Sequence, residues 1–151
     1  MVISNINNDK MIFHHTQKLF LPNFNTMKLP AAVFIDAGSF YINNRDPNQK
    51  KQVSPRIFKA HFRLDGEGFS DLWHKLSCHI KHNDSQNTVL FSTCQPSHLL
   101  WALHYMYVYS SEGVCASFIG ISAKTYRKYV WAIISFLSTT SNGIVSFLLL
   151  I

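Results

Sequence analysis

Three helical segments with almost no connecting chain between them restrict the fold of this sequence more than any other feature. Residues 96–108, 112–119 and 123–137 each carry apolar side chains at helical spacing, and the first segment is apolar on nearly every face. Gly120 ends the second segment, and Ser122 provides an N-cap for the third. Such short connections bring successive helices into direct contact. The sequence therefore predicts an all-α fold, a short helical bundle that ends in a helix-turn-helix.

Two more helices are expected upstream of this group. Ser54 is an N-cap residue, and Pro55 occupies the first helical position, where the missing N–H costs nothing. After a turn at residues 65–68, Ser70 is expected to cap a second helix over residues 71–82. Both predicted helices carry an apolar face that can pack against the three that follow.

Residues 1–53 are predicted to be a largely disordered polar and basic arm in front of a helical domain at residues 54–138. The apolar run at residues 31–35 is compatible with one short strand, but its pattern does not decide the matter. The chain has 14 lysines and arginines against 8 acids, a net charge of +6, which suits a polyanionic partner such as nucleic acid. The arm residues expected to contact phosphates are Arg45, Lys50 and Lys51.

Residues 111–137 have the features of a DNA-binding helix-turn-helix, in which two helices cross through a turn of about three or four residues. Gly120 supplies the tight exit from the first helix, because a positive φ is readily accessible to glycine. Ala116 is small at the point where the two helices must approach closely. The apolar side chains expected to face inward are Cys115, Ile119, Ile121, Tyr126 and Tyr129.

The opposite face of residues 123–137 is basic. Lys124, Arg127 and Lys128 recur at helical spacing and form one stripe, which suits a helix that lies in the major groove. Arg127 is the expected base contact because a guanidinium can bond bidentately, and the two lysines are expected to neutralise phosphates. The predicted DNA-binding residues are Ser122, Lys124, Thr125, Arg127, Lys128 and Trp131.

The segments 98–106, 108–116 and 120–131 resemble the helix-turn-helix that precedes the catalytic domain in Harbinger-like DDE transposases. The resemblance covers residues 55–137 and is most specific at residues 97–131. In that family the module helps to recognise transposon DNA, and catalysis belongs to a downstream ribonuclease-H-like domain with three metal-binding carboxylates. The resemblance implies a transposase-derived, DNA-binding fragment that is truncated before the catalytic domain.

Residues 138–151 contain no acidic residue, so the catalytic acidic triad of the resembled family is absent. The sequence therefore predicts a protein that is not an enzyme, requires no cofactor or metal, and has double-stranded DNA as its partner. Three widely spaced cysteines and the lack of a signal peptide favour a nuclear or nucleocytoplasmic protein that is not secreted.

Three alternatives stay open. A charge-free stretch follows Lys128 and is compatible with a tail-anchored membrane helix, but turn-forming residues at 138–143 interrupt it and argue against a membrane partner. The apolar tail at 139–151, interpreted as the remnant of a truncated domain, would favour self-association and is compatible with a degenerate, non-functional transposon remnant. A zinc-bound interaction module is compatible with the spacings Cys78-x3-His82 and Cys94-x3-His98.

Overall fold

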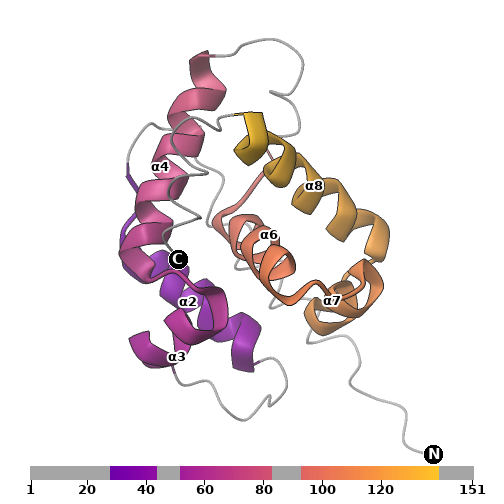
Figure 1. Ribbon diagram of the computed structural model, residues 1–151. Coiled ribbons are helices and arrows are strands. Elements are labelled where there is room, and N and C mark those ends of the chain that lie inside the picture. The colour runs from indigo at the N-terminus through magenta and orange to yellow at the C-terminus, as the bar shows by residue number, and fades with distance from the viewer. Residues whose placement is uncertain (1–27, 44–51, 83–92, 140–151) are drawn as a thin grey trace, which may run out of the picture.

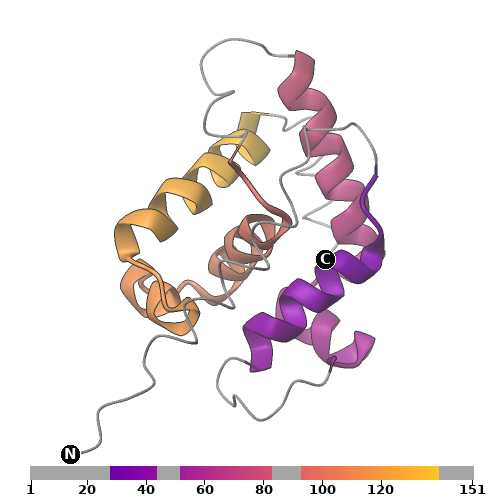
Figure 2. The same cartoon turned by 180° about the vertical axis from the view of Figure 1, so that it is seen from behind.

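The computed structural model of this protein describes residues 28–43, 52–82 and 93–139, and all regular secondary structure in these ranges is helical. The helices are α2 (Ala31–Asn43), α3 (Pro55–Phe62), α4 (Gly66–His82), α6 (Pro96–Val108), α7 (Glu112–Ile119) and α8 (Ala123–Thr139). Helices α2, α3 and α4 form one group, and α6, α7 and α8 form a second group beside it (Figures 1 and 2). The predicted all-α fold is confirmed.

Helix α6 is buried on every side from His98 to His104, and only its C-terminal end is exposed. All seven residues from His98 to His104 are buried, whereas a helix at the surface of a domain would bury a single face. Helix α6 contacts α2 and α3 in the first group and α8 in the second. The nearly all-apolar character of residues 96–108 is thus explained by a central position, as the sequence predicts.

Helix α8 packs on α6 through aromatic side chains. Tyr126 is fully buried, its ring stacks on that of Trp101 with centroids 6.1 Å apart, and its hydroxyl donates to the Trp101 carbonyl oxygen at 3.4 Å. The ring of Tyr129 stacks on that of His98 at 3.9 Å. Nδ1 of His98 accepts a hydrogen bond from the Gln95 backbone N–H at 3.0 Å. Burial lowers the pKa of His98 to about 3, so the imidazole packs as a neutral ring at physiological pH.

Helix α2 corrects part of the prediction that residues 1–53 form a disordered arm. It is a helix where the sequence allowed a short strand at residues 31–35, and its Phe34 is fully buried in the core. The physical reason is that α2 is apolar or small on most of its faces, so no helical stripe marks it in the sequence. The folded domain therefore begins before the predicted boundary. Residues 1–27 and 44–51 of the predicted arm lie outside the described residues.

Helix α3 begins as predicted. The Ser54 hydroxyl accepts a hydrogen bond from the Ile57 backbone N–H at 3.3 Å, and Pro55 follows in the first turn. The helix ends at Arg63, which has a left-handed φ of 64° and donates its N–H to the Lys59 carbonyl oxygen at 2.8 Å. The connection to α4 is short as a result.

Helix α4 begins earlier than predicted. The turn expected at residues 65–68 is the first turn of the helix, where Oδ1 of Asp65 accepts a hydrogen bond from the Gly68 backbone N–H at 2.8 Å. Ser70, the predicted cap, is instead fully buried, and its hydroxyl donates to the carbonyl oxygen of Leu29. The predicted cap therefore joins α4 to the chain before α2 and does not cap the helix.

Two glycines allow α2 to approach its neighbours closely. A Cβ on Gly66 of α4 would lie 2.9 Å from the side chain of Ile35. A Cβ on Gly38 of α2 would lie 2.3 Å from the ring of Phe58 and 2.8 Å from that of Phe62. Both distances are shorter than carbon atoms tolerate, so these positions require the absence of a side chain.

We expect Gly38→Ala to lower the free energy of unfolding by about 1–3 kcal/mol, the usual cost of overpacking a dense core. Phe58 is fully buried, so its ring has little room to move aside. Gly113→Ala is the control, because a Cβ there meets nothing within 4 Å and the position lies within α7. That change should raise stability by up to about 1 kcal/mol through helix propensity. Urea unfolding measures both variants, and an unchanged stability of Gly38→Ala would contradict the packing described.

Candidate nucleic-acid interface

The turn between α7 and α8 is closed by backbone hydrogen bonds. Gly120, the predicted turn residue, has a φ of 73°, and its N–H donates to the Ser117 carbonyl oxygen at 3.3 Å. The N–H of Ile121 donates to the Ala116 carbonyl oxygen at 3.1 Å. These bonds satisfy carbonyl groups at the end of α7 and end that helix within one residue. The next helix starts at once, so α7 and α8 pack against each other.

Serine hydroxyls cap both helices of this unit. The Ser111 hydroxyl accepts a hydrogen bond from the Val114 backbone N–H at 3.3 Å at the start of α7. At the start of α8, the Ser122 hydroxyl accepts from the Thr125 backbone N–H at 3.1 Å and lies 2.9 Å from the Thr125 hydroxyl. Ser122 and Thr125 are exposed, so the N-terminal end of α8 lies at the protein surface with two hydroxyl groups beside it.

The predicted inward face of the unit is inward in the structure. Cys115, Ile119 and Tyr126 are buried, whereas Ile121 and Tyr129 are half-buried against the same core. Burial raises the pKa of Tyr126 far above that of a free tyrosine, and the neighbouring Cys115 thiol adds to the effect. The tyrosine hydroxyl is therefore a neutral packing group, and α8 is anchored from beneath.

The predicted outward stripe is exposed. Lys124, Arg127, Lys128 and Trp131 all lie on the solvent side of α8, opposite the buried face. Helix α8 forms one edge of the molecule in both overall views (Figures 1 and 2). The ammonium group of Lys128 lies 5.2 Å above the ring of Tyr129, which holds this charge close to the helix surface.

A carboxylate also lies on this face, which the sequence does not predict. Oε2 of Glu112, in the first turn of α7, accepts a hydrogen bond from Nε of Arg127 at 2.5 Å. Oε1 of the same carboxylate accepts from Nε1 of Trp131 at 2.6 Å. The sequence shows that Arg127 and Trp131 are one helical turn apart and therefore lie side by side on the helix. Only the contact between α7 and α8 brings the third residue to them.

The Glu112 carboxylate is ionised at neutral pH. The hydrogen bond from Trp131, and secondly the bond from Arg127, hold the pKa of Glu112 below its usual range. Because the pKa is lowered on folding, the contact stabilises the unit at a pH above the ordinary glutamate value. That stabilisation is lost as the pH falls below this value and passes through the lowered pKa.

The predicted phosphate contacts of the arm, Arg45, Lys50 and Lys51, lie outside the described residues. The basic residues that follow them, Arg56 and Lys59, are exposed on α3. Helices α3 and α8 lie on opposite sides of α6 (Figures 1 and 2). These two cations therefore do not extend the stripe on α8.

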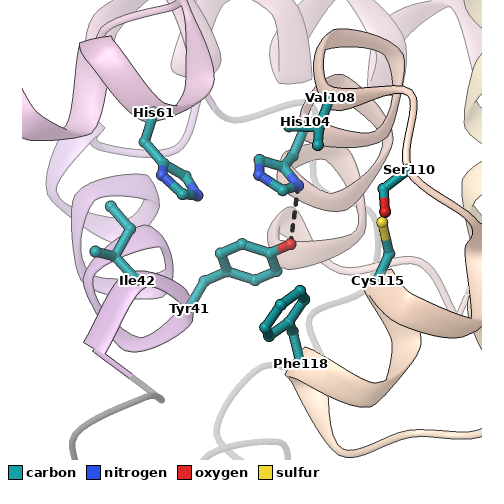
Figure 3. A pocket seen from close by; sticks show the side chains of 8 residues that line it. All are labelled: Tyr41, Ile42, His61, His104, Val108, Ser110, Cys115 and Phe118. Atoms are coloured by element: carbon teal, nitrogen blue, oxygen red, sulfur yellow. Dashed lines mark hydrogen bonds between the residues drawn. The ribbon is translucent and has the colours of Figure 1, made fainter.

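A pocket of about 260 Å³ lies between α2, α3, α6 and α7 (Figure 3). The Tyr41 hydroxyl and Nδ1 of His104 form a hydrogen bond of 2.9 Å, and the ring of His61 stacks on that of His104 at 4.7 Å. None of the described residues that line this pocket is a lysine or an arginine. The lining residues are Tyr41, Ile42, His61, His104, Val108, Ser110, Cys115 and Phe118.

The residues considered for zinc are placed as follows. Cys94 is buried, and burial raises the pKa of its thiol to about 12, although Lys128 opposes this slightly. His98 uses Nδ1 for the Gln95 N–H, and the side chain of His82 is outside the described residues. Within the described parts of the chain, no group of three or more His, Cys, Asp or Glu side chains is arranged to hold a metal ion.

Across residues 28–43, 52–82 and 93–139, no helix combines the length and the apolar character needed to cross a membrane. The predicted apolar tail reaches from the end of α8 to Ile151, and its residues 140–151 lie outside the described residues. The tail-anchor and self-association predictions both depend on this segment.

No protein-family model, curated protein or solved structure matches this chain. The resemblance to Harbinger-like DDE transposases therefore stays a prediction that depends on residues 97–131. Any function proposed for α7 and α8 must be argued from their geometry and charge.

We expect Trp131→Phe to raise the pKa of Glu112 toward the ordinary glutamate value of about 4.3. Phenylalanine keeps an apolar ring but removes the N–H that donates to Oε1 of Glu112. Carbon-13 NMR of the side-chain carboxyl groups, recorded as the pH is lowered, measures the change. The same Glu112 pKa in both proteins would show that the indole does not hold this carboxylate in solution.

Proposed function

We propose that this protein is a DNA-binding helix-turn-helix fragment without catalytic activity, and that α8 enters the major groove of double-stranded DNA. The observation that carries the proposal is the two-sided character of α8. Its inner face is buried against α6 and α7, and its outer face exposes Lys124, Arg127 and Lys128. A helix fits the width of the major groove, and cations on its outer face meet the phosphates on either side.

Each exposed residue has a distinct part in the proposal. Arg127 contacts a base edge, because its planar guanidinium can form paired hydrogen bonds, whereas Lys124 and Lys128 neutralise phosphates. Ser122 and Thr125 place hydroxyls at the start of α8, where a phosphate is also favoured by the helix dipole. Trp131 contributes by holding Glu112 and by covering the end of the stripe.

The origin and location that we propose follow from the resemblance. Residues 97–131 resemble the helix-turn-helix of Harbinger-like DDE transposases, so the protein would derive from such an enzyme and retain its DNA-binding part. A duplex-DNA partner is in keeping with a nuclear location, and the excess of positive charge is in keeping with a polyanion.

The proposal is tested by duplex-DNA binding in fluorescence anisotropy at about 50 and 200 mM salt, the range over which phosphate contacts weaken strongly. A Lys124→Ala/Arg127→Ala/Lys128→Ala variant should bind at least about tenfold more weakly at the lower salt. Its plot of log K against log salt should be flatter by about 2, because it lacks the two lysines that contact phosphates and each phosphate contact adds about 0.9 to the slope. Circular dichroism must show that the variant stays helical.

The matched control is Arg56→Ala/Lys59→Ala/Lys75→Ala, which removes three exposed cations from α3 and α4 and changes the net charge equally. It should bind close to the unaltered protein. Equal losses in the two variants would mean that DNA responds to total charge and that α8 has no special part. A folded protein that binds no duplex would overturn the proposal.

A further inference from the structure

The Glu112 carboxylate accepts a hydrogen bond from Nε of Arg127, and the rest of the Arg127 guanidinium extends toward solvent. We infer that Glu112 is a positioning residue that presents Arg127 for end-on pairing with guanine, and so sets a base preference. This inference rests on the proposed function, because it names the base that the same helix selects. It concerns specificity, whereas the proposal above concerns where DNA binds.

The contact is asymmetric in exposure. The Glu112 side chain is 17% exposed and lies against α8, whereas the Arg127 side chain is 64% exposed. The Trp131 indole N–H holds the second oxygen of the same carboxylate at 2.6 Å. The Glu112 carboxylate is therefore covered and bound at both oxygens, whereas the Arg127 side chain that it holds extends into solvent. This arrangement is suited to a side chain that is positioned for an external partner.

The atoms used by the contact restrict what the arginine can bind. Arginine can pair with a base through Nε and one terminal nitrogen, or end-on through its two terminal nitrogens. In Arg127 the Nε donor is bound to Glu112, so the end-on mode uses donors that this contact does not occupy. Two parallel N–H donors require two acceptors on the partner.

Guanine fits this requirement better than the other bases. In the major groove it presents two acceptors, O6 and N7, whereas adenine presents one acceptor and one donor. Cytosine presents a donor, and thymine a single acceptor beside a methyl group. An arginine confined to end-on pairing therefore prefers guanine. A lysine in the same place would attract phosphates and bases with little distinction.

Positioning by Glu112 also reduces the side-chain conformational entropy that Arg127 would lose on binding. A free arginine side chain samples many rotamers, and fixing it in one geometry opposes binding. Glu112 has already restricted Arg127 at Nε. Lys124 and Lys128 make no comparable contact with Glu112, as suits phosphate contacts, which tolerate variable geometry.

The same carboxylate could act instead as a competitor, since it occupies a cation that a phosphate would otherwise attract. The two roles predict opposite results when its charge is removed. A competitor's removal strengthens binding to every duplex and leaves base preference as it was. A positioning residue's removal weakens base preference and leaves the average affinity for duplexes similar or slightly higher, because one negative charge is lost.

The experiment uses the full chain and a library of short duplexes with a randomised centre. The best-bound duplex is then compared with a partner in which the preferred G·C pair is replaced by A·T. The unaltered protein should favour the G·C duplex by about 5- to 150-fold, the range for one bidentate pair. Glu112→Gln should reduce this ratio to within about threefold, because a glutamine has one acceptor oxygen for two donors.

Glu67→Gln is the matched control. The chain has two glutamates, and Glu67 lies on the exposed side of α4, so both variants change the net charge equally. It should keep the guanine preference. Arg127→Lys is a second variant that leaves the Glu112 side chain intact, and it should retain salt-sensitive binding while losing the preference. It tests whether Arg127 carries the preference. If Glu112→Gln unfolds, Trp131→Phe, which removes the N–H that holds Oε1 of Glu112, should weaken the preference and so tests the inference.

The outcomes separate the inference from the proposed function. Duplex binding with no base preference, or a guanine preference that survives in a folded Glu112→Gln or in Arg127→Lys, overturns the inference and leaves DNA binding by α8 standing. Tighter binding of Glu112→Gln with an unchanged preference identifies a competitor and also overturns it. A folded protein that binds no duplex overturns both. Loss of the preference in both variants, with its retention in Glu67→Gln, supports the inference.

Discussion

The burial of α6 on all sides is the constraint on which the rest of the structure depends. A helix with seven consecutive buried residues needs partners around its whole circumference, and α2, α3 and α8 supply them. The aromatic pairs of His98 with Tyr129 and of Trp101 with Tyr126 hold α8 in one orientation on it. Once these pairs form, the outward face of α8 is determined as well.

This packing gives the two faces of α8 different roles, one in the core and one at the surface. The inward apolar side chains of α8 belong to the core, whereas Lys124 and Lys128 lie outside it on the opposite face. Glu112 is the exception, since it joins α7 to α8 and also holds Arg127 at the surface. A surface that can change without cost to the core, with one position held firmly, is well suited to selecting a ligand.

Local hydrogen-bonding needs explain what the sequence could predict. Ser54, Ser111, Ser122 and Gly120 each satisfy or relieve backbone groups within their own turn, so their roles are visible without knowledge of distant residues. Helix α2 could not be predicted, because apolar or small residues occur on most of its faces, so its buried Phe34 and Gly38 do not stand out as the stripe of an amphipathic helix. The Glu112 contact depends on residues 15 and 19 positions away and on how α7 meets α8.

The most direct test of this account is an NMR titration of backbone amides with a short DNA duplex at low salt. If the outer face of α8 meets the groove, the largest shift changes should fall at residues 120–131, and the amides of α2 and α4 should change little. Changes centred on α2, α3 or α4, or spread evenly over the exposed lysines and arginines, would contradict the assignment of α8 as the DNA-binding helix.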